Sequence, residues 1–299
     1  MPVANGERLW PGWDSLFAPW TIPPPTILDG RYRIGALLGS GGMGQVFVGE
    51  DLRLGRQVAI KVVRPGPDDA TLGERLFREA RAAARSDHPA VVTAFGYGSD
   101  PDLGVDYFVM ERLHGETVGQ RIQRIGPLPL ALLQRIAIET CDALGAVHDA
   151  GVIHRDLKPN NLFLATRGPR VDELRLLDFG VAKQLSLQTI TATGQIWGTP
   201  VYMAPEQLLD AKRVDPRCDL YALGAVLYEC LTGSPPFEAD NAVAMAFKVV
   251  HESAPDARAL RPDAPVELVE LISRCMRKDP DERFQHARQL QRALQELAI

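Results

Sequence analysis

The chain has 299 residues, 45% of them hydrophobic, so it can bury a substantial core as one large domain or two smaller ones. Its formal charge of -5 excludes the strongly basic composition typical of nucleic-acid-binding domains. Its four cysteines form no C-x-x-C pair, which argues against zinc sites and disulfide frameworks, and we expect buried or half-buried thiols in a reducing compartment.

The first 30 residues are rich in proline and tryptophan and precede the first alternating apolar segment. They show neither a positively charged leader nor an apolar core of the secretory type. Trp10, Trp13, Phe17 and Trp20 recur at near-helical spacing, although the prolines argue against a long helix. Two interpretations remain open: a tail that docks on the rest of the chain or on a regulatory partner, and a disordered tail.

Short alternating segments predict strands between about residue 31 and residue 110, namely "RYRIGALLG", "QVFVGED", "QVAIKVV", "VVTAFGYG" and "YFVMER". One segment among them, "TLGERLFREARAAARS", predicts a helix. From "GQRIQRI" to the C-terminal "HARQLQRALQELA", helical periodicity takes over. The longest apolar run, "LYALGAVLYECLTG", is too short to cross a bilayer, so we expect no membrane span and a cytoplasmic protein.

The stretch "GSGGMG", Gly39 to Gly44, fits the spacing G-x-G-x-x-G, which two classes of nucleotide-binding fold use. In a dinucleotide-binding fold, a helix should follow the glycines directly, because its N-terminus holds the pyrophosphate. Here two alternating segments follow instead. The pattern therefore predicts a hairpin whose glycine-rich turn can bring backbone N–H groups close to phosphates.

Four further motifs follow in order along the chain: "VAIK" at Val58 to Lys61, "HRDLKPNN" at His154 to Asn161, "LLDFG" at Leu176 to Gly180, and "GTPVYMAPE" at Gly198 to Glu206. Each could occur by chance, but the ordered series is specific. Over about residues 31 to 295 the chain resembles a protein kinase catalytic domain, and is most similar to the eukaryotic-like serine/threonine kinases of bacteria.

The resemblance implies an α+β fold with two lobes, a small β-rich N-lobe with one main helix and a larger, mostly helical C-lobe. Residues 1–30 would be a tail ahead of the catalytic domain, which would span residues 31–299. Within it we expect the N-lobe at 31–110, the hinge at 111–115, the C-lobe at 116–299 and the activation segment at 178–206.

The resemblance also implies ATP and Mg²⁺ as cofactors, with Mn²⁺ as an alternative to Mg²⁺. Lys61 would hold the phosphates and pair with a helix carboxylate, for which Glu79 is favoured over Glu74. Asp156 would accept or orient the proton of the substrate hydroxyl, and Lys158 would reach the transferring phosphate. The metal ligands would be the hard oxygen donors of two residues, Asn161 and Asp178.

For the nucleotide, the resemblance implies an adenine held between Val46 and Ala59 above and Phe163 below, with Met110 as gatekeeper. The backbone of Glu111 and Leu113 would bind the adenine, and Glu116 is a candidate for the ribose hydroxyls. The full implied ATP site comprises Leu38, Gly39, Ser40, Gly41, Gly42, Met43, Gly44, Val46, Ala59, Lys61, Met110, Glu111, Leu113, Glu116 and Phe163.

Other matched residues would be structural. Asp219 would support the backbone of the catalytic loop, Glu206 would pair with Arg283, and Phe179 and Gly180 would set the pose of Asp178. Thr199, together with "DLKPNN", points to serine and threonine rather than tyrosine acceptors. In the activation segment, Thr191 and Thr193 align best with regulatory phosphorylation sites. The less favoured alternative is that both are polar loop residues that are never phosphorylated.

The function implied is a serine/threonine protein kinase that acts on protein substrates and phosphorylates its own activation segment. One alternative is a pseudokinase-like scaffold that binds ATP without transfer, but the four residues such proteins tend to lose, Lys61, Asp156, Asn161 and Asp178, are all present. A small-molecule kinase of related fold should lack the "APE" and "GTP" elements, and both are present. Neither alternative is favoured.

Overall fold

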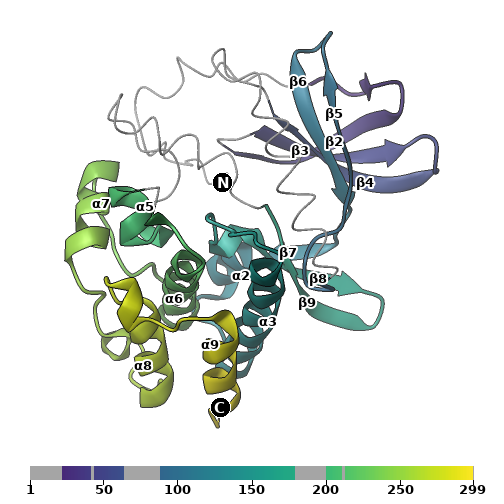
Figure 1. Ribbon diagram of the computed structural model, residues 1–299. Coiled ribbons are helices and arrows are strands. Elements are labelled where there is room, and N and C mark those ends of the chain that lie inside the picture. The colour runs from purple at the N-terminus through teal and green to yellow at the C-terminus, as the bar shows by residue number, and fades with distance from the viewer. Residues whose placement is uncertain (1–21, 42–43, 64–87, 179–199, 211–212, 299) are drawn as a thin grey trace, which may run out of the picture.

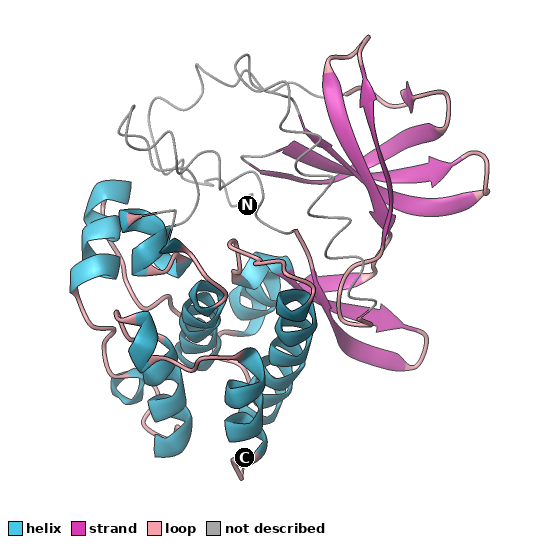
Figure 2. Ribbon diagram, viewed as in Figure 1, coloured by secondary structure: helices cyan, strands magenta, loops and turns pink. Residues whose placement is uncertain are grey.

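The computed structural model describes residues 22–41, 44–63, 88–178, 200–210 and 213–298. They form two lobes, a strand-rich one and a larger helical one (Figures 1 and 2). The expected α+β architecture with two lobes is therefore confirmed. Among the described residues, none of the helices is both long enough and apolar enough to cross a membrane.

The N-lobe is built on a six-stranded antiparallel sheet in the order β1-β2-β3-β4-β6-β5. Its strands are β1 (Ile27–Leu28), β2 (Tyr32–Gly41), β3 (Gly44–Asp51), β4 (Arg56–Val63), β5 (Ala94–Asp100) and β6 (Val105–Glu111). Strands β2 and β3 form the hairpin expected at the glycine motif, with Gly41 opposite Gly44. Gly44 has a φ of 143°, and a Cβ there would lie 2.1 Å from the Val62 carbonyl oxygen, so this position requires glycine.

The chain segment ahead of β2 belongs to the N-lobe. Ile22 and Leu28 are buried in the same apolar cluster as Ile34 and Tyr107, and β1 pairs with β2. Tyr107 packs edge-on against Tyr32. The packed core of the N-lobe thus includes residues from Ile22 onward. The sequence carries little local signal for this packing, because "TIPPPTIL" contains only two adjacent strand residues and three prolines.

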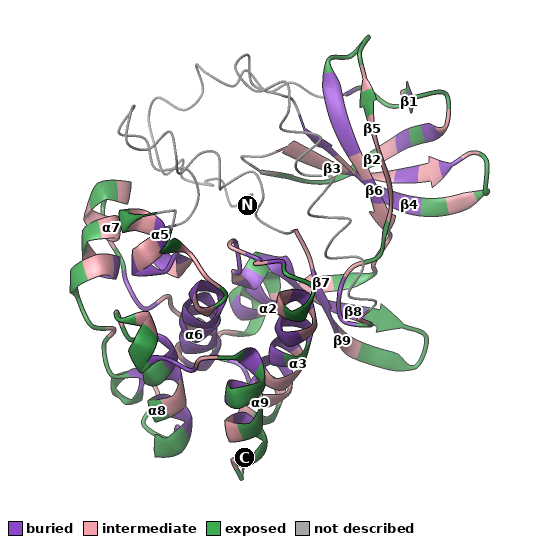
Figure 3. Ribbon diagram, in the orientation of Figure 1, coloured by how far each residue is buried: buried purple, intermediate pink, exposed green. Residues whose placement is uncertain are grey.

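The C-lobe packs around helix α6 (Arg217–Thr232), of which thirteen of sixteen residues are buried (Figure 3). A helix that is apolar on all sides must be surrounded by other elements. At Gly224 a Cβ would lie 2.6 Å from that of Cys275, so α6 and α8 approach closely. The other helices of this lobe are α2 (Val118–Ile125), α3 (Leu130–Asp149), α5 (Pro205–Leu209), α7 (Ala242–His251), α8 (Val266–Cys275) and α9 (Ala287–Gln295).

The four cysteines are free and buried, as expected, and burial raises the pKa of each thiol. Nucleophilic thiolates are therefore not available at these positions. The cysteines serve as small apolar residues of the C-lobe core.

A small sheet, β7 (Gly115–Thr117), β8 (Leu162–Arg167) and β9 (Arg170–Leu176), lies where the lobes meet (Figure 1). Residues 90–92 join it, because Leu176 donates to the Ala90 carbonyl and accepts from the Val92 N–H. Ala90 and Val91 belong to the C-lobe core. Strands β8 and β9 thereby present the residues at their ends, Asn161 and Asp178, to the space between the lobes.

The packing of β1 predicts different costs for two adjacent substitutions. Leu28→Ala should lower the free energy of unfolding by about 2–5 kcal/mol, because Leu28 is fully buried. Ile27→Ala should change it by less than about 0.5 kcal/mol, because the Ile27 side chain is 47% exposed. Urea denaturation of both variants measures the difference. Equal effects would show that β1 is not part of the N-lobe core.

Candidate active site

Asp156 lies at the centre of a cluster of polar groups in the loop between α3 and β8. Lys158 donates from Nζ to Asp156 Oδ2 at 2.9 Å. Asn161 donates from Nδ2 to the Asp156 carbonyl oxygen at 2.7 Å and to Oδ2 at 3.3 Å. Asp156 is only 6% exposed. The carboxylate is thus held in one orientation with a cation beside it, which suits a group that accepts a proton from a substrate hydroxyl.

A second carboxylate, that of Asp219 at the start of α6, supports this loop from below. It is fully buried and accepts the backbone N–H groups of His154 and Arg155, both at 2.8 Å. His148 Nε2 lies 2.7 Å from Asp219 Oδ2. Burial alone would raise the pKa of Asp219, but these hydrogen bonds, His148 foremost, keep it below the ordinary value.

The backbone of the loop is strained where Asp219 holds it. Arg155 has a φ of 63°, the left-handed region that costs a non-glycine residue about 1–3 kcal/mol. Gln207 adds a further hold, since its Nε2 donates to the Arg155 carbonyl oxygen at 3.0 Å. Sequence analysis did not single out Gln207. Its position three residues after Ala204, where a glutamine can reach back to the helix N-cap, was the available signal.

Lys61 and Asp178 meet across the lobes. Lys61 on β4 places Nζ 2.9 Å from Asp178 Oδ1, and the two side chains are 19% and 36% exposed. Asp178 has a φ of 44°, a second strained backbone position. Leu177 donates its N–H to the Asn161 carbonyl oxygen at 2.8 Å, which sets Asp178 and Asn161 side by side.

These oxygen donors fit a divalent cation of the magnesium type. Because Asn161 uses its Nδ2 to bind Asp156, its amide oxygen is left without a partner among the described residues. Asp178 contributes a partly exposed carboxylate whose second oxygen makes no ion pair within the described part of the chain. Hard, oriented oxygens with room for phosphate oxygens and water are what Mg²⁺ requires.

One face of the N-lobe sheet carries four of the expected nucleotide-binding residues, Val46, Ala59, Lys61 and Met110, and Phe163 lies on β8. Val46 lies opposite Lys61 in the register of β3 and β4. Ala59 lies two residues before Lys61, on the same face, and opposite Met110. Phe163 on β8 pairs with Thr117 of β7 on the C-lobe side. Leu38, Gly39 and Ser40 lie on β2 before the glycine turn, and the Leu38 side chain is 53% exposed.

Glu116, expected at the ribose, is already engaged by two arginines. Its Oε1 accepts from Arg121 Nε and from Arg124 Nη2, and its Oε2 accepts from Arg124 Nε at 3.2 Å. Arg121 also binds Asp172 at 2.7 Å. The hydrogen bond from Arg124, supported by Arg121, lowers the pKa of Glu116 to about 2. Sequence analysis did not identify these arginines, although their spacing of three places both on one face of α2.

The expected structural pair Glu206–Arg283 is present as two parallel hydrogen bonds of 2.7 Å. Arg283 is fully buried and also donates to three backbone carbonyl groups, so η6 (Pro280–Glu282) and α5 are tied together. Several other expected residues lie outside the described residues: Gly42, Met43, Glu79, Phe179, Gly180, Thr191, Thr193 and Thr199.

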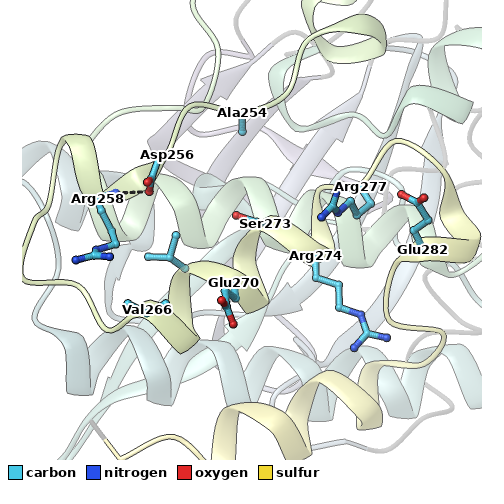
Figure 4. A pocket seen from close by; sticks show the side chains of 10 residues that line it. Ala254, Asp256, Arg258, Val266, Glu270, Ser273, Arg274, Arg277 and Glu282 are labelled. Carbon is cyan, nitrogen blue, oxygen red and sulfur yellow. Dashed lines mark hydrogen bonds between the residues drawn. The ribbon is translucent and has the colours of Figure 1, made fainter.

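A separate pocket of about 850 Å³ lies on the C-lobe between residues 254–258 and α8 (Figure 4). None of its lining residues belongs to the cluster around Asp156. Three acidic and three basic side chains surround it, in no arrangement that converges on one point: Asp256, Glu270, Glu282, Arg258, Arg274 and Arg277. This pocket is therefore separate from the cluster around Asp156.

The Glu116 cluster predicts a pH-dependent contribution to stability. Because the pKa of Glu116 is lowered in the folded protein, its contribution is present above about pH 4.5 and is lost as the pH falls toward 2. Glu116→Gln should therefore lower the free energy of unfolding by about 1 kcal/mol at neutral pH, and by less at each step below about pH 4.5. The control is Glu238→Gln at an exposed position, which should change the free energy of unfolding at neutral pH by less than about 0.5 kcal/mol. Urea titrations across this pH range measure the free energy of unfolding of both variants and of wild type. A difference between Glu116→Gln and wild type that does not change with pH would contradict the proposed contribution of the Glu116 cluster.

Comparisons with known proteins identify relatives of this chain. The chain is 41% identical over 272 residues to the DNA damage-responsive serine/threonine-protein kinase RqkA of Deinococcus radiodurans, covering 88% of this chain and 39% of that one. It is 38% identical over 261 residues to the serine/threonine-protein kinase PknA of Mycobacterium tuberculosis, covering 86% and 59%. The chain thus spans less than two thirds of each relative's length.

Among solved structures, the PknI kinase domain of Mycobacterium tuberculosis superimposes with a TM-score of 0.74 at 27% identity, covering 93% of this chain and all of that one. The family model described as "Protein kinase domain" matches residues 32–295. The chain belongs to the protein kinase family, and the two relatives described above are bacterial serine/threonine kinases.

Proposed function

We propose that this protein transfers the γ-phosphoryl group of ATP, in the presence of Mg²⁺, to serine and threonine hydroxyl groups of protein substrates. The observation that carries the proposal is the convergence of Asp156, Lys158 and Asn161 with the Lys61–Asp178 pair. Family membership and the names of the relatives support the same activity.

In the proposed reaction the substrate hydroxyl oxygen forms a bond to the γ-phosphorus, while the bond to the oxygen that bridges the β- and γ-phosphates breaks. ADP leaves, and the hydroxyl proton passes to a carboxylate oxygen of Asp156. Lys158, 2.9 Å from that carboxylate, lies where it can stabilise the charge on the transferring group. Bound Mg²⁺ supplies charge neutralisation at the phosphates, and Asn161 and Asp178 would hold it through their oxygens.

Lys61 would hold the α- and β-phosphates as a compact cation. Its ion pair with Asp178 brings the phosphate-binding group of the N-lobe to the metal-binding group of the C-lobe. The two lobes would therefore position the nucleotide jointly. Positioning of this kind provides much of the catalysis in phosphoryl transfer, because the protein takes little covalent part in it.

Three further features of the proposal concern regulation and setting. We propose that the protein phosphorylates its own activation segment on Thr191 or Thr193, and that the phosphate is bound by Arg155, beside the catalytic carboxylate.

The tail of residues 1–30, with its tryptophans, would contact a regulatory protein partner. The four free, buried cysteines suit a cytoplasmic location.

The proposed role of Asp156 predicts that Asp156→Asn abolishes phosphoryl transfer, with a loss of at least about 1,000-fold, while ATP still binds. The control is Asp149→Asn, at the end of α3, whose side chain is 61% exposed; it should keep full activity. Incorporation of ³²P from labelled ATP into the protein and into a generic protein substrate measures both. An active Asp156→Asn variant would remove the proposed mechanism, and an inactive wild type that binds ATP would favour a scaffold.

A further inference from the structure

Within the described residues, the chain passes between the lobes at two points that lie next to each other. Residues 88–92 are attached to the C-lobe, because His88 binds Asp142 on α3 and Val92 donates to Leu176 on β9. The chain then enters the N-lobe at Thr93, directly before β5. It returns to the C-lobe after Glu111, the last residue of β6, through the hinge. Figure 1 shows β5 and β6 running down together toward β7 and β8.

Glu111 joins these two passages through both its backbone and its side chain. Its N–H donates to the Thr93 carbonyl oxygen at 2.9 Å, and its Oε1 accepts the Thr93 N–H at 2.9 Å. Its Oε2 accepts from Arg167, at the end of β8, at 3.2 Å. The Glu111 side chain is 12% exposed, whereas that of Arg167 is 69% exposed. The carboxylate therefore links three segments, and its hydrogen bonds to Thr93 and to Arg167 both lie at the protein surface.

We propose that the Glu111 carboxylate is a positioning residue for nucleotide binding: it clamps the two passages between the lobes and so fixes the backbone of the hinge. This inference rests on the proposed function, in which the backbone of Glu111 and Leu113 receives the adenine. The side chain would not touch the nucleotide. Its effect would reach the ligand through the backbone of Glu111: the N–H and the side chain of this residue are both bound to Thr93, and its carbonyl group extends from the same Cα atom.

Neighbouring contacts support a hinge held from both sides. Arg112 Nη1 donates to Gln57 Oε1 on β4 at 2.6 Å, which ties the next residue to the N-lobe. The His114 carbonyl oxygen accepts from Thr166 at 2.7 Å, which ties the end of the hinge to β8. Glu111 precedes both of these ties, and its carboxylate is bound to the backbone of the other passage.

The test compares Glu111→Ala with Glu111→Gln. Glutamine keeps an oxygen that can accept the Thr93 N–H, whereas alanine removes it. We expect Glu111→Ala to weaken the dissociation constant for ATP with Mg²⁺ by about fivefold, to raise KM for ATP similarly, and to leave kcat within about twofold. Glu111→Gln should stay close to wild type. Calorimetric titration and steady-state kinetics measure these values.

A measurement without nucleotide keeps the inference separate from the proposed function. In Glu111→Ala the Thr93 amide should exchange with deuterium about fivefold faster than in wild type, and in Glu111→Gln at nearly the wild-type rate. Arg167→Gln should change the exchange rate of the Thr93 amide only slightly. The control is Arg170→Gln on the same hairpin, which should leave that rate unchanged, because Arg170 pairs only with Glu173 among the described residues.

Three outcomes are informative. Faster Thr93 exchange together with weaker ATP binding in Glu111→Ala supports the clamp. If Glu111→Ala leaves both the exchange of the Thr93 amide and the affinity for ATP unchanged, the proposal is overturned. It is also overturned if Glu111→Gln weakens ATP binding as much as Glu111→Ala does. If wild type binds no ATP, the proposed function fails, and the exchange rates alone then decide whether Glu111 holds the two passages together.

Discussion

The buried carboxylate of Asp219 is the constraint on which the arrangement of the candidate active site depends. A carboxylate with no exposure to water is costly unless hydrogen bonds satisfy it. Here two consecutive backbone N–H groups and His148 do so. The same contacts hold Arg155 in a left-handed conformation that its side chain disfavours. Asp156, the next residue, is thereby directed toward Lys158 and Asn161.

The hydrophobic core places Asp219 where it can act in this way. Asp219 lies in the first turn of α6, and the rest of that helix is packed on all sides by the C-lobe. A rigid, buried helix is a suitable support, because polar groups fixed to it cannot relax away from their partners. Arg283 and Glu206 extend the support to α5, and Gln207 on the same short helix reaches the Arg155 carbonyl group. The catalytic loop is thus held from below and from one side.

The sequence was informative wherever a function requires a fixed order of residue types. The glycine-rich hairpin, the two lobes and the residues around Asp156 could all be predicted, because local patterns and short motifs carry them. The sequence could not predict which charged residues would pair with one another. Glu116 has suitable arginines five and eight residues away, yet only the folded structure shows that both bind it. The partner of Glu111 could not be predicted either, because Thr93 is close to Glu111 in the folded structure but distant from it in the sequence.

Segments with weak local signals were also missed. Leu28 is fully buried, but it lies between prolines and a turn and belongs to a strand of two residues. Its position is determined by tertiary packing on Ile34 and its neighbours in the N-lobe core, not by periodicity. Gln207 is a comparable case, because its role depends on the strained carbonyl group that it binds.

The most direct test of the role given to Asp219 is the turnover number of Asp219→Asn, a substitution of nearly equal volume, at saturating ATP and substrate. An asparagine can accept fewer of these hydrogen bonds and leaves the loop less firmly held. The account predicts that kcat falls by at least about tenfold, in a variant that remains folded and still binds ATP. A folded Asp219→Asn variant with wild-type kcat would show that the catalytic loop does not depend on this carboxylate.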